Sequence, residues 1–253
     1  MTATITSLYR HPVKGFTPER LTHADLAVGE GFPCDRLYAV ENGPSGFDPA
    51  APVFIPKTRF AVLMRIADVA KARTSYDEAT GVLSATAEGQ PPIAADLTTD
   101  AGREAFAVWL AQLLGEEAQG PLKVIRAPGS WRFMDSTKGH VSIINLASVR
   151  DLEARIGLPL DPLRFRANLY VEGWEPWVEN EWPERRLRVG GAETTVIKPI
   201  VRCAATHVDP TTAERDIDVV RALFDNYGHM FCGIYVQTLV AGRVAEGDLL
   251  ELI

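Results

Sequence analysis

The sequence predicts a β-rich α+β protein. Most apolar segments are short and are bounded by Pro, Gly or Asp, two segments have the pattern of hairpins, and three segments have the apolar spacing of helices. With 253 residues and 46% hydrophobic content, the chain can bury a core without disulfides, as one large domain or two of ordinary size.

The first part of the chain is dominated by predicted strands. These are expected at residues 5–9, 26–28, 37–40 and 60–66. A hairpin is expected at 76–86, turning around Glu78-Ala79-Thr80-Gly81. The Gly- and Pro-rich stretch 42–56 has no periodicity, so we expect a long loop there.

A helix is predicted from Thr99 or Asp100 to Gly115, which supplies a C-cap. Its apolar positions are Phe106, Trp109, Leu110, Leu113 and Leu114. The polar loop 116–121 follows, and we expect a domain boundary near residue 121, giving domains at 1–121 and 122–253.

The second part contains the other two predicted helices, a hairpin and the last strand. One helix is expected at about 145–156, stopped by Gly157, and the other carries Ile217, Val220 and Phe224. The hairpin is expected at 187–197, around Gly190-Gly191, and the last strand at 249–253.

Composition excludes several classes of function. A net charge of −7 opposes a nucleic-acid partner, because phosphate backbones require clustered Lys and Arg. The three cysteines, Cys34, Cys203 and Cys232, are too few for a disulfide scaffold. With no signal peptide and no apolar run long enough to span a bilayer, we expect a cytoplasmic protein without a membrane partner.

Cys203 is the strongest candidate for chemistry. It follows Arg202 directly and precedes the turn Asp209-Pro210. A neighbouring guanidinium favours the thiolate, which is the form that attacks electrophiles and binds soft metals. Of the basic clusters, Arg164 and Arg166 can hold a small polyanion, whereas 185–188 is expected to be the solvated side of a strand.

Seven segments resemble, in order and spacing, motifs of the molybdenum cofactor sulfurase C-terminal (MOSC) domain family. They are 8–15, 34–36, 133–136, 164–169, 171–182, 199–210 and 242–248. The arrangement is similar to that of the mitochondrial amidoxime-reducing component branch. The resemblance implies an N-terminal β-barrel-like domain at 1–121 and a MOSC β-barrel with peripheral helices at 122–253.

The resemblance also implies a cofactor, molybdenum-molybdopterin, and not pyridoxal phosphate. Cys203 would be the metal ligand and a catalytic residue, and Asp209 would position a substrate or proton, unless it is only a turn residue before Pro210. A soft thiolate suits the metal, and cations with hydrogen-bonding groups suit the phosphate and the pterin. The cofactor-binding residues would be Lys14, Arg36, Asp135, Ser136, Arg166, Asn168, Arg202, Cys203 and Tyr235.

On this basis we expect an oxidoreductase that reduces N-hydroxylated or related N-oxygenated small molecules. Its electrons would come from a separate redox protein, since the chain has no Cys-rich tail for an iron-sulfur cluster. A non-enzymatic carrier of the cofactor or of sulfur, using Cys203 as a binding or persulfide thiol, is the alternative.

Two further hypotheses do not depend on the resemblance to the MOSC family. Cys203, His207, His229 and Cys232 have the residue types of a structural zinc site. Cys203 with His207 or His140 as a base would instead suit nucleophilic hydrolysis.

Overall fold

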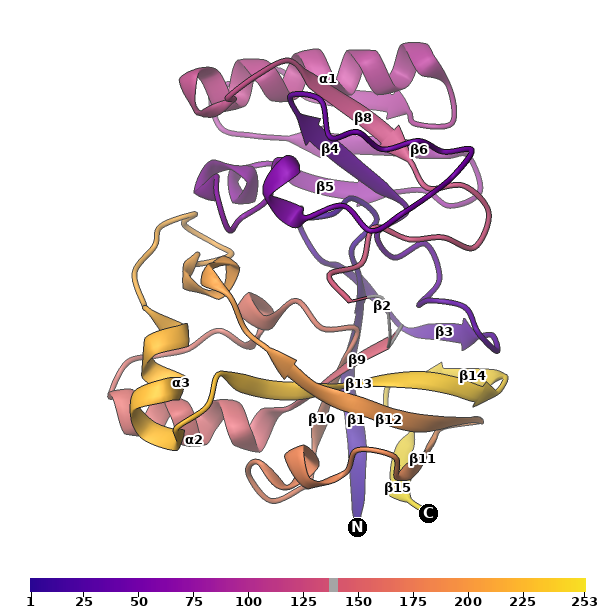
Figure 1. The fold of residues 1–253 in the computed structure, drawn as a ribbon, viewed down its shortest axis with the longest axis vertical. Helices are drawn as coiled ribbons and strands as arrows, with labels where there is room; N and C mark the ends of the chain where they lie inside the picture. Colours follow the sequence, from indigo (N-terminus) through magenta and orange to yellow (C-terminus); the bar gives the residue numbers. More distant parts are fainter. Residues whose placement is uncertain (137–140) are drawn as a thin grey trace.

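The computed structural model describes residues 1–136 and 141–253, which form a closed β-barrel and a second lobe packed beside it (Figure 1). The α+β, β-rich fold class is confirmed. The barrel strands follow one another in the order β10-β9-β13-β12-β11-β15-β1, and β1 pairs with β10 to close the ring. They are β1 (Thr2–Arg10), β9 (Val141–Asn145), β10 (Leu169–Glu172), β11 (Arg186–Val189), β12 (Ala192–Val201), β13 (Phe231–Val240) and β15 (Leu249–Leu252).

Alternating side chains fill the barrel. In β11, Leu187 and Val189 are buried while Arg186 and Arg188 face solvent, as expected for a strand with one solvent-exposed face. The turn at Gly190-Gly191 joins β11 to β12, so the predicted hairpin at 187–197 is confirmed. Three further short strands lie at the margin of the barrel: β2 (Glu19–Leu21), β3 (His23–Leu26) and β14 (Gly242–Ala245).

The second lobe, at the top of Figure 1, contains two small sheets and the longest helix, α1 (Asp100–Leu114). Its strands are β4 (Tyr38–Asn42), β5 (Arg73–Tyr76), β6 (Val82–Thr86), β7 (Ile93–Asp96) and β8 (Leu122–Arg126). The predicted helix is confirmed at both ends: Gly102 N donates to the Thr99 hydroxyl over 3.1 Å, and Gly115 is the C-cap. The hairpin at 76–86 and the loop after Asn42 are also confirmed.

Two helices cover the barrel, α2 (Leu146–Ile156) and α3 (Val219–Tyr227). The prediction for α2 is confirmed, but the apolar face predicted for α3 is wrong. Asp218 accepts from Arg221 N and begins the helix after Ile217, and the buried pair is Val219 and Leu223, whereas Phe224 is 59% exposed. The predicted pair, Val220 and Phe224, has the same helical spacing as the buried pair. Periodicity alone therefore could not choose between these two adjacent faces of the helix.

The predicted strand at 60–66 is also wrong. Phe60 makes one bridge to Glu41, and the chain then turns, with Arg65 N and Ile66 N both donating to Val62 O. The run is apolar because most of its side chains are buried, and a short apolar run does not reveal its backbone conformation. The strand predicted at 26–28 begins earlier, as β3. Short 3-10 helices complete the chain at Lys57–Arg59, Ala67–Lys71, Gly115–Glu117, Pro162–Phe165, Val178–Glu181 and Ala204–His207.

The two hydrophobic cores each draw on residues from both sides of residue 121, and the domain boundary expected there stays a prediction. Strand β1 belongs to the barrel, β3 pairs with β14, and β8 pairs with β4 of the second lobe. Val124 and Phe133 pack in the core of that lobe as well. Residues 134–136 therefore leave the second lobe and bring Asp135 to the junction with the barrel. None of the helices in the described part of the chain is long and apolar enough to cross a membrane.

Candidate functional site

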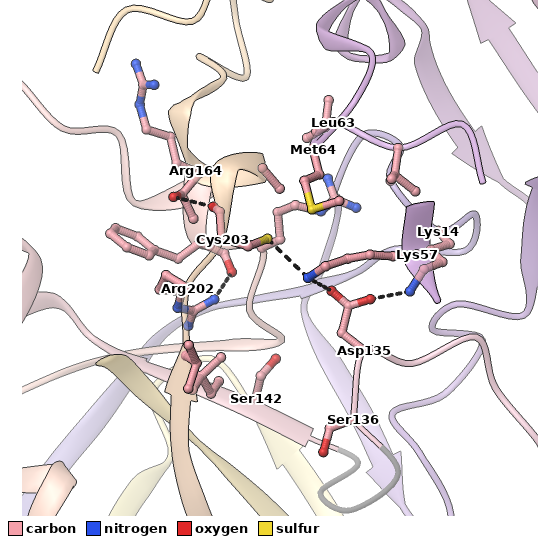
Figure 2. A pocket seen from close by; sticks show the side chains of 18 of the residues that line it. Lys14, Lys57, Leu63, Met64, Asp135, Ser136, Ser142, Arg164, Arg202 and Cys203 are labelled. Atoms are coloured by element: carbon pink, nitrogen blue, oxygen red, sulfur yellow. Dashed lines mark hydrogen bonds and ion pairs between the residues drawn. The ribbon is translucent and has the colours of Figure 1, made fainter. Parts of the chain in front are cut away.

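A cavity of about 340 Å³ lies between the two lobes, within the usual size range of small-molecule sites. The second lobe and the N-terminal segment line one wall, the end of β12 and the turn after it line the other, and Asp135 and Ser136 lie between them (Figure 2). The predicted site residues that line it are Lys14, Arg36, Asp135, Ser136, Arg166, Arg202, Cys203 and Tyr235.

Cys203 enters the cavity from the end of β12. Its backbone is extended, and its carbonyl accepts from the backbone N and the hydroxyl of Thr206 at 3.0 and 2.9 Å. This begins the 3-10 helix Ala204–His207 and turns the chain away, while the sulfur points toward the second lobe (Figure 2). There the ammonium of Lys57 lies 3.2 Å from Cys203 Sγ.

Lys57, Asp135 and Lys14 form a chain of charges across the cavity (Figure 2). Lys57 Nζ lies 3.1 Å from Asp135 Oδ2, and the buried Lys14 ammonium contacts the other carboxylate oxygen and donates to Phe133 O at 2.8 Å. Burial lowers the pKa of Lys14. Burial alone would also lower the pKa of Lys57. The contacts of Lys57 with Asp135 and Cys203 outweigh burial and raise that pKa. Burial alone would raise the pKa of Asp135, but Lys14 and Lys57 hold it below its usual range.

The cation at Cys203 is therefore Lys57, and the expectation that Arg202 would serve this thiol is wrong. Arg202 donates from Nε to Cys232 O at 2.8 Å and from Nη1 to Phe165 O at 2.7 Å, and it stacks on the Phe165 ring. Neighbouring side chains on an extended backbone point to opposite sides, so adjacency in sequence does not imply contact. Sequence reasoning missed Lys57, which follows a loop without any motif.

Arg36 and Arg166 lie at another part of the cavity wall. Both have left-handed backbones, with φ values of 51° and 53°, and Arg36 Nη2 donates to Arg166 O at 3.1 Å. Burial, and then the charge of Arg36, lower the pKa of Arg166 to about 10. One buried nitrogen of Arg166, Nη2, has no hydrogen-bond partner among the described residues. Two adjacent guanidinium groups, one with an unused donor, suit an anionic ligand.

A buried pair behind Arg36 holds that guanidinium in place. Asp35 contacts Arg36 Nη1 and accepts from His11 N at 2.6 Å, while His11 Nδ1 lies 3.3 Å from the same carboxylate oxygen. Burial opposes the charge of Arg36, but Asp35 more than offsets this and raises the pKa of Arg36. Burial, and then Arg166, lower the pKa of His11 to about 3, so its ring is neutral.

Two predicted site residues do not line the cavity. The amide of Asn168 is engaged within the barrel, because Oδ1 accepts from Ser142 N and Oγ at 3.0 and 2.9 Å and Nδ2 donates to Tyr9 O at 3.2 Å. Asp209 accepts from the backbone N of Thr211 at 2.7 Å and pairs with Arg164 at 2.7 Å. These contacts agree with the turn role for Asp209.

The contacts do not support a zinc site or a Cys-His dyad. Within residues 1–136 and 141–253, no cluster of three or more His, Cys, Asp or Glu side chains could hold a metal ion. Cys232 is fully buried, which raises its pKa to about 12, and His207 Nε2 lies 3.1 Å from Asp218 Oδ1. His140, the other candidate base, lies outside the described residues.

Comparisons with known proteins were made after the site was described. Residues 131–251 match the MOSC domain model, and residues 2–120 match the model of the MOSC N-terminal beta barrel domain. The Molybdenum cofactor sulfurase of Anopheles gambiae is 30% identical over 171 residues, which are 59% of this chain and 21% of that protein. That of Danio rerio is 28% identical over 275 residues, covering 92% of this chain and 32% of that protein. The chain thus spans about a third or less of these relatives.

Among solved structures, the YUAD protein of Bacillus subtilis is 16% identical with a TM-score of 0.49, and the match covers 100% of this chain and 96% of that one. YiiM of Geobacillus stearothermophilus is 20% identical with a TM-score of 0.37, covering 46% of this chain and 54% of that one.

Proposed function

Since this chain belongs to the MOSC family, with a MOSC N-terminal beta barrel domain at residues 2–120 and a MOSC domain at 131–251, we propose that it binds the molybdenum cofactor in the cavity between its lobes. Cys203 is the proposed protein ligand to the metal. The curated relatives bear the name Molybdenum cofactor sulfurase, which supports a role connected with this cofactor.

The residues of the cavity fit such a group. Molybdopterin has a phosphate at one end and soft sulfur ligands for the metal at the other, so its site requires a cationic grip and a thiolate. Nη2 of Arg166, beside Arg36, is a buried guanidinium nitrogen that has no acceptor among the described residues. This observation carries the proposal, because such a nitrogen leaves a place for a phosphate oxygen. Tyr235 and Ser136 line the same cavity and can serve the pterin edge.

We propose further that the chain reduces N-oxygenated small molecules. An N-hydroxyl compound is converted to the corresponding N–H compound with two electrons and two protons, and its oxygen leaves as water. The bound cofactor supplies the two-electron oxygen chemistry, and a separate redox protein supplies the electrons. The chain itself holds the cofactor through Cys203, Arg36 and Arg166 and encloses the reacting groups between its two lobes.

A sulfur carrier is the second candidate. The name of the curated relatives favours it, as does the exposure of part of Cys203 to the cavity beside the Lys57 ammonium, which would stabilise a persulfide anion. In that case Cys203 would carry sulfur and the protein would not turn over N-oxygenated compounds.

Replacing Cys203 with Ala is expected to abolish retention of molybdenum, because the substitution removes the metal ligand. The measurement is elemental analysis with pterin fluorescence on protein made in a host that synthesises the cofactor. Cys34→Ala is the matched control, since Cys34 is also a free, partly exposed thiol but does not line the cavity. Equal molybdenum in wild type and the Cys203 variant would refute the ligand assignment.

Reduction of N-oxygenated compounds is then tested on the protein with the molybdenum cofactor bound. We expect the reduced centre to reoxidise faster with benzamidoxime than without it. If molybdenum is bound but benzamidoxime does not change the rate, the reductase proposal fails. Detection of a persulfide on Cys203 would then favour the carrier.

Replacing Arg166 with Met is expected to reduce pterin retention by roughly tenfold or more, since hydrogen bonds to a charged group are each worth about 1.5–3 kcal/mol. Pterin fluorescence per mole of protein after dialysis measures this. Arg132→Met is the control, because Arg132 lies outside the cavity and donates to backbone carbonyls. Equal retention in Arg166→Met and wild type would remove Arg166 from the binding site.

A further inference from the structure

The cavity around Cys203 is lined by more cationic side chains than carboxylates. Of the described residues that line the cavity, seven are Lys or Arg and one, Asp135, is acidic. Carboxylates outside the cavity pair with two of the seven, Arg36 and Arg164, and Lys14, Lys57, Arg166, Lys198 and Arg202 remain. Asp135 is shared between Lys14 and Lys57, so this group of three keeps a net positive charge. In a chain of net charge −7, such a concentration is local and points to an anionic ligand.

The cofactor phosphate assigned to Arg36 and Arg166 does not use the cations near the sulfur. Lys57 contacts Cys203 Sγ directly, and the exposed Lys198 lines the cavity as well. An ammonium group has three N–H donors, and Lys57 uses them on Asp135 and Cys203 alone among the described residues. One N–H donor of Lys57 and much of its positive charge are therefore available to a molecule that binds beside the Cys203 sulfur.

The wall next to Lys57 is apolar. Leu63 and Met64 line the cavity from the second lobe, the same lobe that supplies Lys57 (Figure 2). A small molecule with an apolar body and one anionic group would therefore meet complementary surfaces at this position. A cationic molecule would be repelled by Lys57 and Lys198.

We propose that the cavity beside Cys203 selects small anionic molecules and that Lys57 is the residue that confers this selectivity. Resting on the proposed function, this assigns the substrate class as N-oxygenated compounds that carry a carboxylate. Lys57 comes from the second lobe and Cys203 from the barrel, so the selectivity depends on the packing of the two lobes.

The test compares two alkylating reagents on the cofactor-free protein, the anionic iodoacetate and the neutral iodoacetamide. In both reactions the Cys203 sulfur forms an S–C bond and iodide leaves with the C–I bonding electrons. The ratio of the two rates at one pH therefore cancels the intrinsic reactivity of the sulfur. Peptide mass spectrometry separates Cys203 from Cys34 and Cys232.

In wild type we expect a rate ratio of iodoacetate to iodoacetamide well above that of the same cysteine in urea-unfolded protein. Lys57→Met should lower the folded ratio roughly fivefold, as removal of one charge a few ångströms from the incoming carboxylate implies at an effective dielectric near that of water. Lys57→Arg should restore it because the charge returns. Lys71→Met is the matched control, since Lys71 pairs with Asp68 outside the cavity, and it should leave the ratio unchanged. Added salt should reduce the wild-type ratio.

Equal ratios in wild type and Lys57→Met, or a folded ratio no higher than the unfolded one, would overturn the proposal. The assay requires no molybdenum, so its outcome is independent of the proposed reductase activity. On the loaded protein, 4-carboxybenzamidoxime should be reduced with a higher kcat/KM than benzamidoxime. Equal values for the two compounds would overturn the substrate class while leaving the reductase proposal intact.

Discussion

Replacing Arg164 with Met is expected to lower the free energy of unfolding by about 3–5 kcal/mol, the usual cost of breaking a buried ion pair. The Arg164 side chain is 1% exposed. It donates to both oxygens of Asp216 at 2.7 Å, to Asp209 at 2.7 Å and to His207 O at 3.1 Å. Urea unfolding of wild type and variant measures the loss.

Arg150→Met is the matched control for this substitution. Arg150 pairs with both oxygens of Glu172 at 2.6 Å, so the fork geometry is the same, but its side chain is 55% exposed. Exposed pairs contribute about 0–1 kcal/mol, and the control should lose no more than that. Equal losses in the two variants would show that burial of Arg164 is not the source of its effect. Because Asp209 and His207 follow Cys203 closely, Arg164→Met should also weaken cofactor retention.

Acid should destabilise the protein through His11. The pKa of this fully buried ring lies at about 3, against an ordinary value of 6.5, and burial is the main cause. Between these two values the unfolded chain binds a proton here and the folded chain does not. Stability therefore falls as the pH falls below 6.5. At about 1.4 kcal/mol per pH unit, acidification from pH 6.5 to 4 should cost roughly 3 kcal/mol.

The measurement is urea unfolding at several pH values between 6.5 and 4 for wild type and His11→Gln. His11 Nε2 has no partner among the described residues, so a proton placed there would lack an acceptor. The variant should lose about 3 kcal/mol less than wild type over this range, whatever its stability at neutral pH. His23→Gln, at an exposed position, should keep the wild-type slope. Identical slopes in wild type and His11→Gln would contradict the assignment.

Local signals in the sequence account for much of the fold. The capping residues Thr99 and Gly115 mark both ends of α1, and Gly190-Gly191 marks the hairpin of β11 and β12. Such signals act over a few residues and need no knowledge of the rest of the chain. They were insufficient for the short, mostly buried apolar run at 60–66, and for α3, where two adjacent helical faces are both apolar.

The candidate site could be predicted only in part, for the same reason. Motif residues from distant segments, including Lys14, Arg36, Arg166 and Cys203, do line one cavity. The sequence could not show whether each of these side chains has a hydrogen-bond donor left for a ligand. Arg202 is engaged with main-chain carbonyls and Asn168 with Ser142 and Tyr9, because the packing of the barrel presents acceptors to them.

The sequence by itself determined the β-rich fold class, the positions of the three helices and the MOSC resemblance, and it made Cys203 the candidate metal ligand. Only the tertiary structure decided that β1 closes the barrel against β10, that the two cores interleave across residue 121, and that Lys57 meets Cys203. Lys57 and Cys203 are 146 residues apart, and no local rule relates them. Their contact exists because two lobes pack with these side chains at the junction, and packing depends on the whole set of buried surfaces rather than on any one segment.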